Sequence, residues 1–559
     1  MKKNCIKISV WSVGFVLTIV FTSLLGITGC KEVPPDITAY NQNYDHTFWV
    51  KINNSDMDID AEQTGYVSSV TARESELKDD CEEVVVHKAQ DSKEGFIGYE
   101  DYVNHHNDYL KTDEWNHAFL KEQREAHKEA QNSKSSQRAR EENVEPQAEE
   151  GFPCEVVKKN YKVGDVKNIF LLDNNNSMYA PLATCEYVSD NCYVWFVDSN
   201  SSLIPRRTFV EKQLFKSIAN QFERIIALEE QLAGSHIYTT KVSQSFANPT
   251  EKLNIVLADL YNDANQKNEV TTWGYCWYND FYDSLSSNKG AFIYLDSYCY
   301  LMNEKYMYST VVHEYNHYLN YASKTVKHNL YFETWFTEML SMVMEDLFQK
   351  KLGLANYDSS QGRLTTFNKY YYAGFTNWRE GEDVLASYAC AYAFGAYLVR
   401  NFGGIELFHQ MLTNEYVNEE SVTQALKACN QKYVDKNGVE QYADFNYVFE
   451  NFYKILINNK SANKVNDPNY ITLNRQIGNS SDALYFTPID IFNTGLYYYG
   501  ELSVPYFYDA SQENQMPIGA HGFCIHHVGA QVGSYRYVKP KSSRVKNIFF
   551  TKYWKDVLN

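Results

Sequence analysis

The sequence lacks an excess of positive charge. Its 559 residues include 52 lysines and arginines against 70 aspartates and glutamates, which gives a formal net charge of −18. Proteins that bind the phosphate backbone of nucleic acids usually present a basic surface. The chain also has no Gly-rich phosphate loop of the P-loop type. We therefore expect no nucleic-acid partner.

Long apolar runs are scarce, because only one segment approaches the length that spans a bilayer. The basic start "MKKNCIK" precedes the run "ISVWSVGFVLTIVFTSLLGITG", which ends at small residues before Cys30. This arrangement resembles a bacterial lipoprotein signal. It predicts a signal peptide over residues 1–29 and a lipidated Cys30 that tethers the protein to the cell envelope, outside the cytoplasm, on the outer membrane or cell surface. A plain transmembrane anchor is the alternative.

The chain has no CxxC pair, so neither a Cys-based zinc ribbon nor a dithiol redox motif is expected. It has 11 cysteines, of which Cys5 lies in the predicted leader and Cys30 is the predicted lipidation site. The remaining cysteines are odd in number, so at least one thiol must be free or paired between molecules. Export makes disulfides possible, and "CEYVSDNC" predicts a hairpin in which Cys185 pairs with Cys192.

Composition divides the chain into consecutive parts. Residues 30–151 are polar and charged, and 109–150 predict an exposed charged helix that continues into a linker. This part is expected to be a tether or a pro-segment. Short β-branched and aromatic runs then predict a small β-rich module over 152–205.

The remainder predicts mixed secondary structure. Residues 206–330 contain a helical pattern closed by a glycine, two strands of one sheet ("KLNIVLADLY" and "GAFIYLDS") and a further helix. Helices with glycine stops fill 331–461, and short β-like runs fill 462–559. The expected fold class is α+β.

The stretch "TVVHEYNHYLNY" carries candidate metal ligands. Residues four apart share one face of a helix, so His313 and His317 can both reach one zinc ion. Glu314 is turned away by about 100° and is placed to take a proton from a metal-bound water. The alternative is a surface helix with two polar histidines. An apolar stripe argues for a buried helix, in which histidines need partners.

A catalytic zinc needs a third protein ligand. The metzincin continuation HExxHxxGxxH is absent, because Asn320 and Ser323 occupy the glycine and histidine positions. The other common solution is a glutamate on a following helix. Three acids are candidates: Glu333, Glu338 and Glu345.

"HEYNH" followed by "WFTEMLSMVME" resembles the zinc-binding signature of the gluzincin metallopeptidases, the thermolysin and aminopeptidase N group. The order of elements is most similar to hyicolysin-type bacterial peptidases. The resemblance implies a thermolysin-like zincin domain in which Zn²⁺ is held by His313, His317 and Glu338. It implies Glu314 as general base and proton shuttle. Glu345 matches a second acid of aminopeptidase-like members that orients a ligand histidine, and a solvated acid is the alternative reading.

The sequence departs from this signature at three positions. Thr337 replaces the usual Asn before the ligand glutamate, Met339 replaces a common Gly, and Met342 stands where thermolysin-type members have an Asp. These departures concern the surroundings of the three ligands. Tyr388, with Tyr392 behind it, is the candidate that stabilises the oxyanion. A tyrosine that only packs in the core is the alternative.

The function predicted is a surface-tethered zinc endopeptidase that hydrolyses extracellular proteins or peptides. No G-x-M-E-N-type segment precedes the HExxH motif, which argues against an aminopeptidase. The strand "GAFIYLDS" is expected to line the cleft and to pair with an extended substrate. The alternative function is a non-catalytic surface lipoprotein, an adhesin or binding protein, on a degenerate zincin fold.

Overall fold

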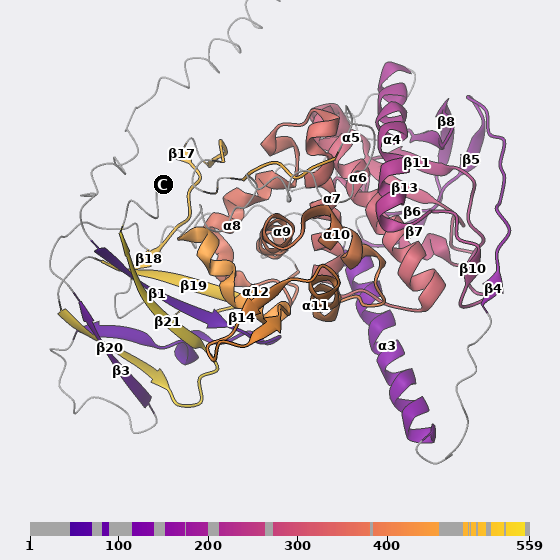
Figure 1. Cartoon of the computed structure of the whole chain (residues 1–559). Helices are drawn as coiled ribbons and strands as arrows, with labels where there is room; N and C mark the ends of the chain where they lie inside the picture. Colours follow the sequence, from indigo (N-terminus) through magenta and orange to yellow (C-terminus); the bar gives the residue numbers. More distant parts are fainter. Residues whose placement is uncertain are drawn as a thin grey trace, which may run out of the picture.

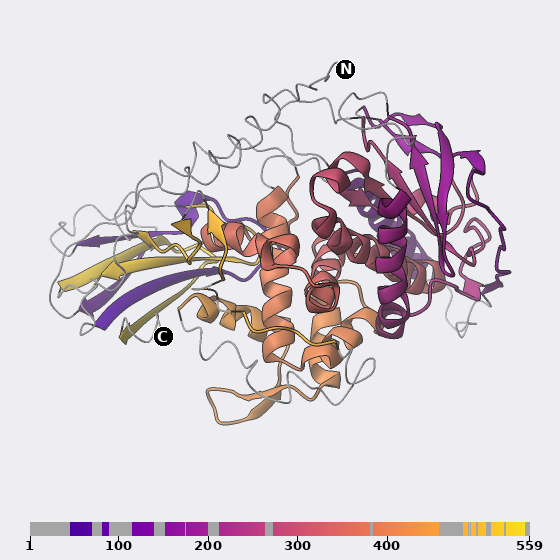
Figure 2. The same ribbon diagram turned by 90° about the horizontal axis from the view of Figure 1, so that it is seen from above.

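The computed structural model describes most of the chain from residue 45 onward. The described residues are 45–69, 81–88, 114–138, 151–173, 175–199, 212–262, 272–380, 384–457, 484–489, 491, 494–498, 501–509, 516–529 and 533–553. They form three parts (Figure 1; Figure 2, from above). A mixed sheet lies at one end, helices fill the centre, and further strands lie at the opposite end. This mixture confirms the α+β prediction.

A six-stranded sheet occupies the first end. Its strands are, in spatial order, β12 (Gly274–Tyr275), β13 (Phe292–Asp296), β11 (Leu253–Ala258), β9 (Cys192–Val197), β8 (Leu182–Val188) and β5 (Val166–Asn168). Strands β9, β11 and β13 are parallel, and the outer pairs are antiparallel. The predicted β module over 152–205 is therefore not a separate unit. Its strand β9 pairs with β11 of the following part, 206–330, so both parts share one sheet.

The two faces of this sheet belong to different cores. Alternate residues of β9 point to opposite sides, as the pleat of a strand requires. Cys192 lies in the core shared with the helices, whereas Cys185 lies in the smaller core on the other face. The hairpin of β8 and β9 is confirmed. The predicted disulfide is wrong, because both thiols are free and face away from each other across the sheet.

Helices cover one face of the sheet and fill the centre. They are α4 (Lys212–Ala233), α5 (Ser297–Met302), α6 (Glu304–Asn320), α7 (Thr334–Leu352), α8 (Leu364–Tyr370), α9 (Val384–Asn401), α10 (Gly404–Thr413), α11 (Glu419–Ala428) and α12 (Phe445–Phe452). The predicted glycine stops at Gly234 and Gly353 are confirmed, with φ of +96° and +71°. Only glycine adopts such angles at little cost.

Helix α7 is buried on all sides from Thr334 to Gln349, and apolar residues predominate in this part of it. A Cβ on Gly395 of α9 would lie 2.7 Å from Met339 Cγ and 2.6 Å from Val343 Cγ2, so this glycine allows α7 and α9 to approach closely. One buried ion pair, Asp346 with Arg400 at 2.7 Å, joins the same two helices. The larger Met339 at the position of a common glycine is thus accommodated by the glycine of the neighbouring helix.

The far end of the molecule is built from both ends of the chain. One sheet has the order β18 (Tyr508–Asp509), β19 (Gly522–Gly529), β1 (Asp45–Asn53) and β21 (Lys546–Tyr553). A second has β20 (Gly533–Pro540) between β2 (Tyr66–Ser69) and β3 (Cys81–Lys88). Strand β1 pairs with β19 and β21 on either side. The prediction of a tether over 30–151 is therefore wrong for these strands, which complete the sheets expected from 462–559 alone.

Four two-stranded pairs complete the described strands. They are β4 (Phe152–Pro153) with β10 (Thr240–Lys241), β6 (Leu171–Leu172) with β7 (Met178–Tyr179), β14 (Lys432–Val434) with β15 (Glu440–Tyr442), and β16 (Tyr497–Tyr498) with β17 (Glu501–Leu502). Short 3₁₀ turns and one π-helical turn, Tyr321–Val326, connect the helices.

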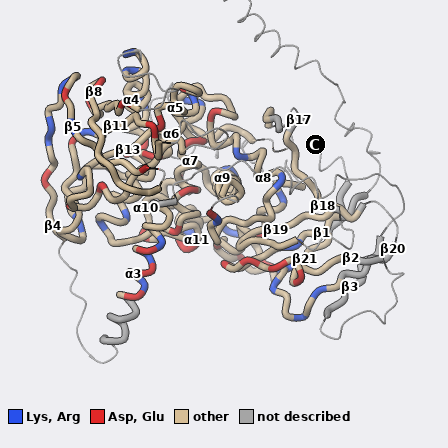
Figure 3. Tube along the Cα trace, turned by 180° about the vertical axis from the view of Figure 1, so that it is seen from behind, with Lys and Arg blue, Asp and Glu red and all other residues tan. Residues whose placement is uncertain are grey.

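The predicted charged helix exists as α3 (Glu114–Arg138). It extends from the helical layer away from the body of the molecule (Figure 1), and acidic and basic residues alternate along it (Figure 3). Its first turns depart from the prediction, because Asn116, His117 and Leu120 are buried. Cys30 and the leader lie outside the described residues. Among the described helices, none has the length and apolarity needed to cross a membrane.

Candidate metal centre

Helix α6 places the two histidines in the interior. Its N-cap is Asn303, the residue before Glu304, and the Asn303 side chain accepts a hydrogen bond from the Tyr306 N–H at 3.1 Å. The helix packs against α4, α7 and β13. His313, Glu314 and His317 are all buried, with exposures of 8%, 5% and 3%. The surface-helix alternative is therefore wrong.

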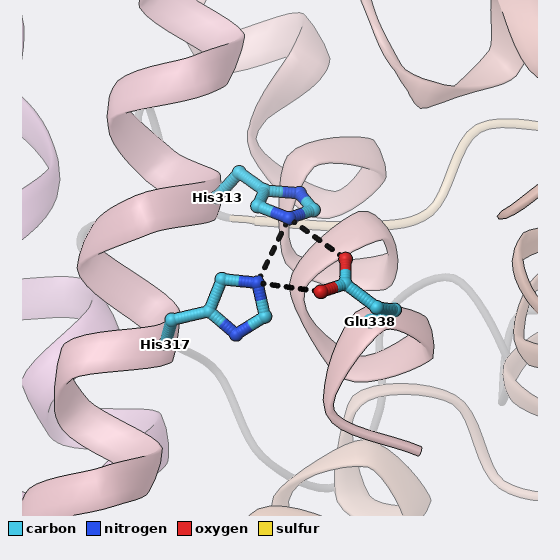
Figure 4. Close-up of side chains that lie close together, drawn as sticks. All are labelled: His313, His317 and Glu338. Atoms are coloured by element: carbon cyan, nitrogen blue, oxygen red, sulfur yellow. Dashed lines mark hydrogen bonds and ion pairs between the residues drawn. The ribbon is translucent and has the colours of Figure 1, made fainter. Parts of the chain in front are cut away.

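Glu338 of α7 completes a cluster of three donor atoms (Figure 4). The Nε2 atoms of His313 and His317 lie 3.0 Å apart, and the carboxylate oxygens of Glu338 lie 3.2 Å and 3.3 Å from them. Ligand atoms held about 2.0–2.1 Å from a tetrahedral zinc lie roughly 3.3–3.4 Å from one another. The spacing therefore fits one zinc-sized ion with a fourth position left for a further ligand.

The charges of the cluster also favour a cation. Burial opposes protonation of His313, but its hydrogen bonds to Glu338 and Glu345 outweigh that cost and raise its pKa well above the usual range. Burial lowers the pKa of His317. Burial alone would raise the pKa of Glu338, yet the charge of His317 and hydrogen bonds from three histidines hold it well below the usual range. A metal that binds here displaces the proton of His313, and two neutral imidazoles and an ionised carboxylate then form a donor set that zinc accepts.

Each histidine is held from behind by a second side chain. His313 Nδ1 lies 2.7 Å from Glu345 Oε1, and His317 Nδ1 lies 3.0 Å from Thr337 Oγ1. Ser309 in turn donates to the other oxygen of Glu345 at 2.6 Å. Both Nε2 atoms consequently face the cluster, as partners of metal-bound histidines arrange them. Glu345 agrees with its expected orienting position, and Thr337, a departure from the gluzincin signature, takes the equivalent position at His317.

The Glu345→Gln variant should bind zinc about tenfold more weakly, the lower end of the 10–100-fold range for such partners. An amide oxygen still accepts from the Nδ1–H of His313, but it no longer carries the charge that makes the imidazole a stronger ligand. Competition with a zinc-binding dye measures the change. Glu333→Gln, at the residue just before the same helix, is the matched control and should bind zinc as the wild type does. Equal affinities for all three proteins would contradict the orienting role.

Strand β12 passes beside Glu314 at the edge of the sheet. A Cβ on Gly274 would lie 3.1 Å from Glu314 Cγ and 2.8 Å from the carbonyl oxygen of Tyr294, so the strand and α6 are in direct contact there. Further along, the Tyr278 hydroxyl lies 3.4 Å from His317 Nδ1. The segment 274–278 therefore borders the metal cluster. Strand β13 pairs with β11 on one side and, at Tyr294 and Leu295, with β12 on the other. The expected pairing of β13 with substrate is therefore wrong at these two residues, where β12 takes that place.

The two predicted tyrosines, Tyr388 and Tyr392, have different surroundings. Tyr388 packs edge-on against Trp378, with ring centroids 4.8 Å apart, and the Arg363 guanidinium lies 4.6 Å above its ring. The Tyr392 hydroxyl donates to Asp346 at 3.1 Å and so faces the buried ion pair. Tyr392 is thus a structural residue and does not stand behind Tyr388 at the cluster.

Glu333 also lies apart from the cluster. It precedes the first turn of α7 and accepts a hydrogen bond from the Trp335 indole at 3.2 Å. Of the three candidate acids, the structure brings only Glu338 to the two Nε2 atoms.

Sequence reasoning missed one residue of the site, His117 of α3. Its Nε2 lies 3.0 Å from Glu338 Oε1 and its Nδ1 lies 3.0 Å from Glu380 Oε1. Burial disfavours the charged imidazole, but the bonds to both carboxylates raise its pKa to about 10. The ring also lies 6.4 Å from that of Tyr388. No spacing rule links His117 to a partner 221 positions away, so no signal in the sequence could have found it.

Part of the chain is similar to known peptidases. Residues 176–443 match the Peptidase M30 family. The matched residues include α6, α7 and the whole three-atom cluster, whereas α3 precedes them. The neutral metalloprotease ShpI of Staphylococcus hyicus is 25% identical over 305 residues, which cover 52% of this chain and 63% of that protein. The chain therefore matches less than two thirds of the length of this relative.

Proposed function

We propose that this protein is a zinc-dependent endopeptidase. The observation that carries the proposal is the cluster of His313, His317 and Glu338 next to Glu314, inside the region similar to Peptidase M30. The printed description of ShpI as a neutral metalloprotease supports the same chemistry. The gluzincin arrangement, in which the third ligand comes from a following helix, agrees with the position of Glu338 on α7.

The residues of the chain have distinct roles in this proposal. His313, His317 and Glu338 hold the metal, which when bound polarises the scissile carbonyl and lowers the pKa of a water to about 7. Glu314 takes the proton of the attacking water and passes it to the leaving amine. Tyr388 is the proposed donor to the developing oxyanion.

The substrate is proposed to be an extended protein segment. Strand β12 ends the six-stranded sheet, so one of its edges has no strand beside it among the described residues. An extended chain can add to such an edge through main-chain hydrogen bonds. The edge borders Glu314, which would bring a bound peptide bond to the general base. Tethering to the cell envelope through Cys30 is part of the proposal, and it places the substrates outside the cytoplasm.

Removal of the metal tests the proposal. The purified protein should contain about one zinc per chain by mass spectrometry, and cleavage of unfolded casein should stop after dialysis against a chelator. Addition of zinc should restore the initial rate, because Glu314 and the ligands remain in place. A protein that holds no zinc, or that cleaves casein equally well without it, contradicts the proposal.

A further inference from the structure

The start of helix α3 lies inside the site, although it comes from a part of the chain outside the M30 match. Asn116 and His117 are 2% and 3% exposed, whereas residues 121–130 of the helix are exposed or only half-buried. The buried turn thus enters the molecule at the metal cluster while the rest of the helix projects from it (Figure 1).

Asn116 forms two hydrogen bonds with the segment that follows β12. Its Nδ2 donates to the Cys276 carbonyl oxygen at 2.5 Å, and its Oδ1 accepts from the Tyr278 N–H at 3.3 Å. Trp277, between these two residues, has the extended angles φ −83° and ψ 107°. In an extended chain the carbonyl of one residue and the N–H two residues later point to the same side, where a neighbouring strand binds. The carboxamide of Asn116 therefore takes the position of a peptide group beside this edge.

His117, the next residue, extends the contact to the cluster itself. Its Nε2 lies 3.0 Å from Glu338 Oε1, on the carboxylate that contacts both ligand histidines. Its ring fills the space beside Trp378 and Tyr388. A substrate whose peptide bond reaches Glu314 must pass through the same space. One turn of α3 thus occupies both the strand edge and the surroundings of the metal.

We infer that α3 is an internal pseudosubstrate, which competes with protein substrates for the edge of residues 276–278 and for the metal cluster. The inference rests on the proposed peptidase function and adds its regulation. Besides the polar contacts above, Leu120 lies in the core and Phe119 packs against Tyr282 with ring centroids 6.0 Å apart. Further along the helix, Arg124 donates a hydrogen bond to the Phe332 carbonyl at 3.2 Å, and the Asn329 amide lies 3.2 Å from His127 Nδ1. Because residues 121–130 are exposed or only half-buried, this helix is displaced more easily than the packed core.

Substitution of Asn116 tests the inference in the full-length chain. Asn116→Ala removes both bonds to the strand edge and touches no metal ligand. A chelator should remove zinc from this variant about tenfold faster than from the wild type, and the initial rate of casein cleavage should also rise about tenfold. A tenfold change corresponds to about 1.4 kcal/mol. Lys121→Ala, on the exposed part of the same helix, is the matched control and should leave both rates unchanged. Equal melting temperatures establish that the variants are folded.

His117→Ala separates inhibition from a role in the reaction. A pseudosubstrate predicts faster cleavage in this variant as well. Slower cleavage in either variant would mean that α3 belongs to the working site, and unchanged rates in both assays would mean that it does not cover the metal. Either result overturns the inference. A chain that holds zinc and cleaves nothing in any variant contradicts the peptidase proposal instead, and the rate of zinc removal then still reports on α3.

Discussion

Replacement of Glu314 by glutamine should lower the rate of casein cleavage by about 10²–10⁴-fold, the usual contribution of a general base. The amide has nearly the same shape as the carboxylate but cannot take a proton from water. Zinc content should stay unchanged, because the three-atom cluster contains no atom of Glu314. Initial rates and mass spectrometry measure the two quantities.

The control for this variant is Glu304→Gln, the same chemical change at the exposed start of the same helix. It should cleave casein at the wild-type rate. The comparison is best made in the wild-type chain and in the Asn116→Ala background, so that a pseudosubstrate does not mask the loss. If the Glu314→Gln protein cleaved casein as fast as its parent in either background, the proposed mechanism would be wrong.

Replacement of Glu338 by alanine should weaken zinc binding more than about 100-fold, since the loss of a partner behind a ligand already costs 10–100-fold. Two histidines on one helix then remain, and a catalytic zinc site needs three protein ligands. The variant should consequently be purified without zinc and should not cleave casein. Calorimetric titration of the metal-free protein with zinc measures the affinity.

Glu333→Ala is the matched control, because Glu333 is an acid of the same segment that contacts Trp335 instead of the cluster. It should retain full zinc content. If Glu333→Ala lost zinc and Glu338→Ala bound it normally, the third ligand would be Glu333, and the assignment to Glu338 would be wrong. Cleavage by a zinc-free Glu338→Ala protein would contradict a role of the metal in the reaction.

The local features of the site followed from the sequence because they depend on neighbouring residues. The i, i+4 spacing puts His313 and His317 on one face of any helix that contains them. Gly353 ends α7 where its positive φ is needed. The apolar residues of α6 and α7 required burial, and the structure buries them. The hairpin of β8 and β9 is local as well.

Only the tertiary structure decides which of Glu333, Glu338 and Glu345 faces the two histidines. These residues are 5 and 7 positions apart along one segment, so their side chains leave α7 in different directions or at different heights. Which of them meets the histidines depends on how α7 packs against α6 and on the close approach to α9 at Gly395. Residue spacing alone left all three possible, and only the resemblance to the gluzincin signature favoured Glu338.

Contacts between distant parts of the chain could not be read from the sequence. Strand β1 enters the sheet of β19 and β21, and His117 reaches Glu338 across 221 positions, although the first residues read as a charged tether. Cys185 and Cys192 are close in sequence but point into separate cores. The sequence by itself determined that His313 and His317 share a helix face with Glu314 beside the first, because helix geometry repeats over a few residues. Only the tertiary structure decided what faces them, because packing brings together segments that no local pattern connects.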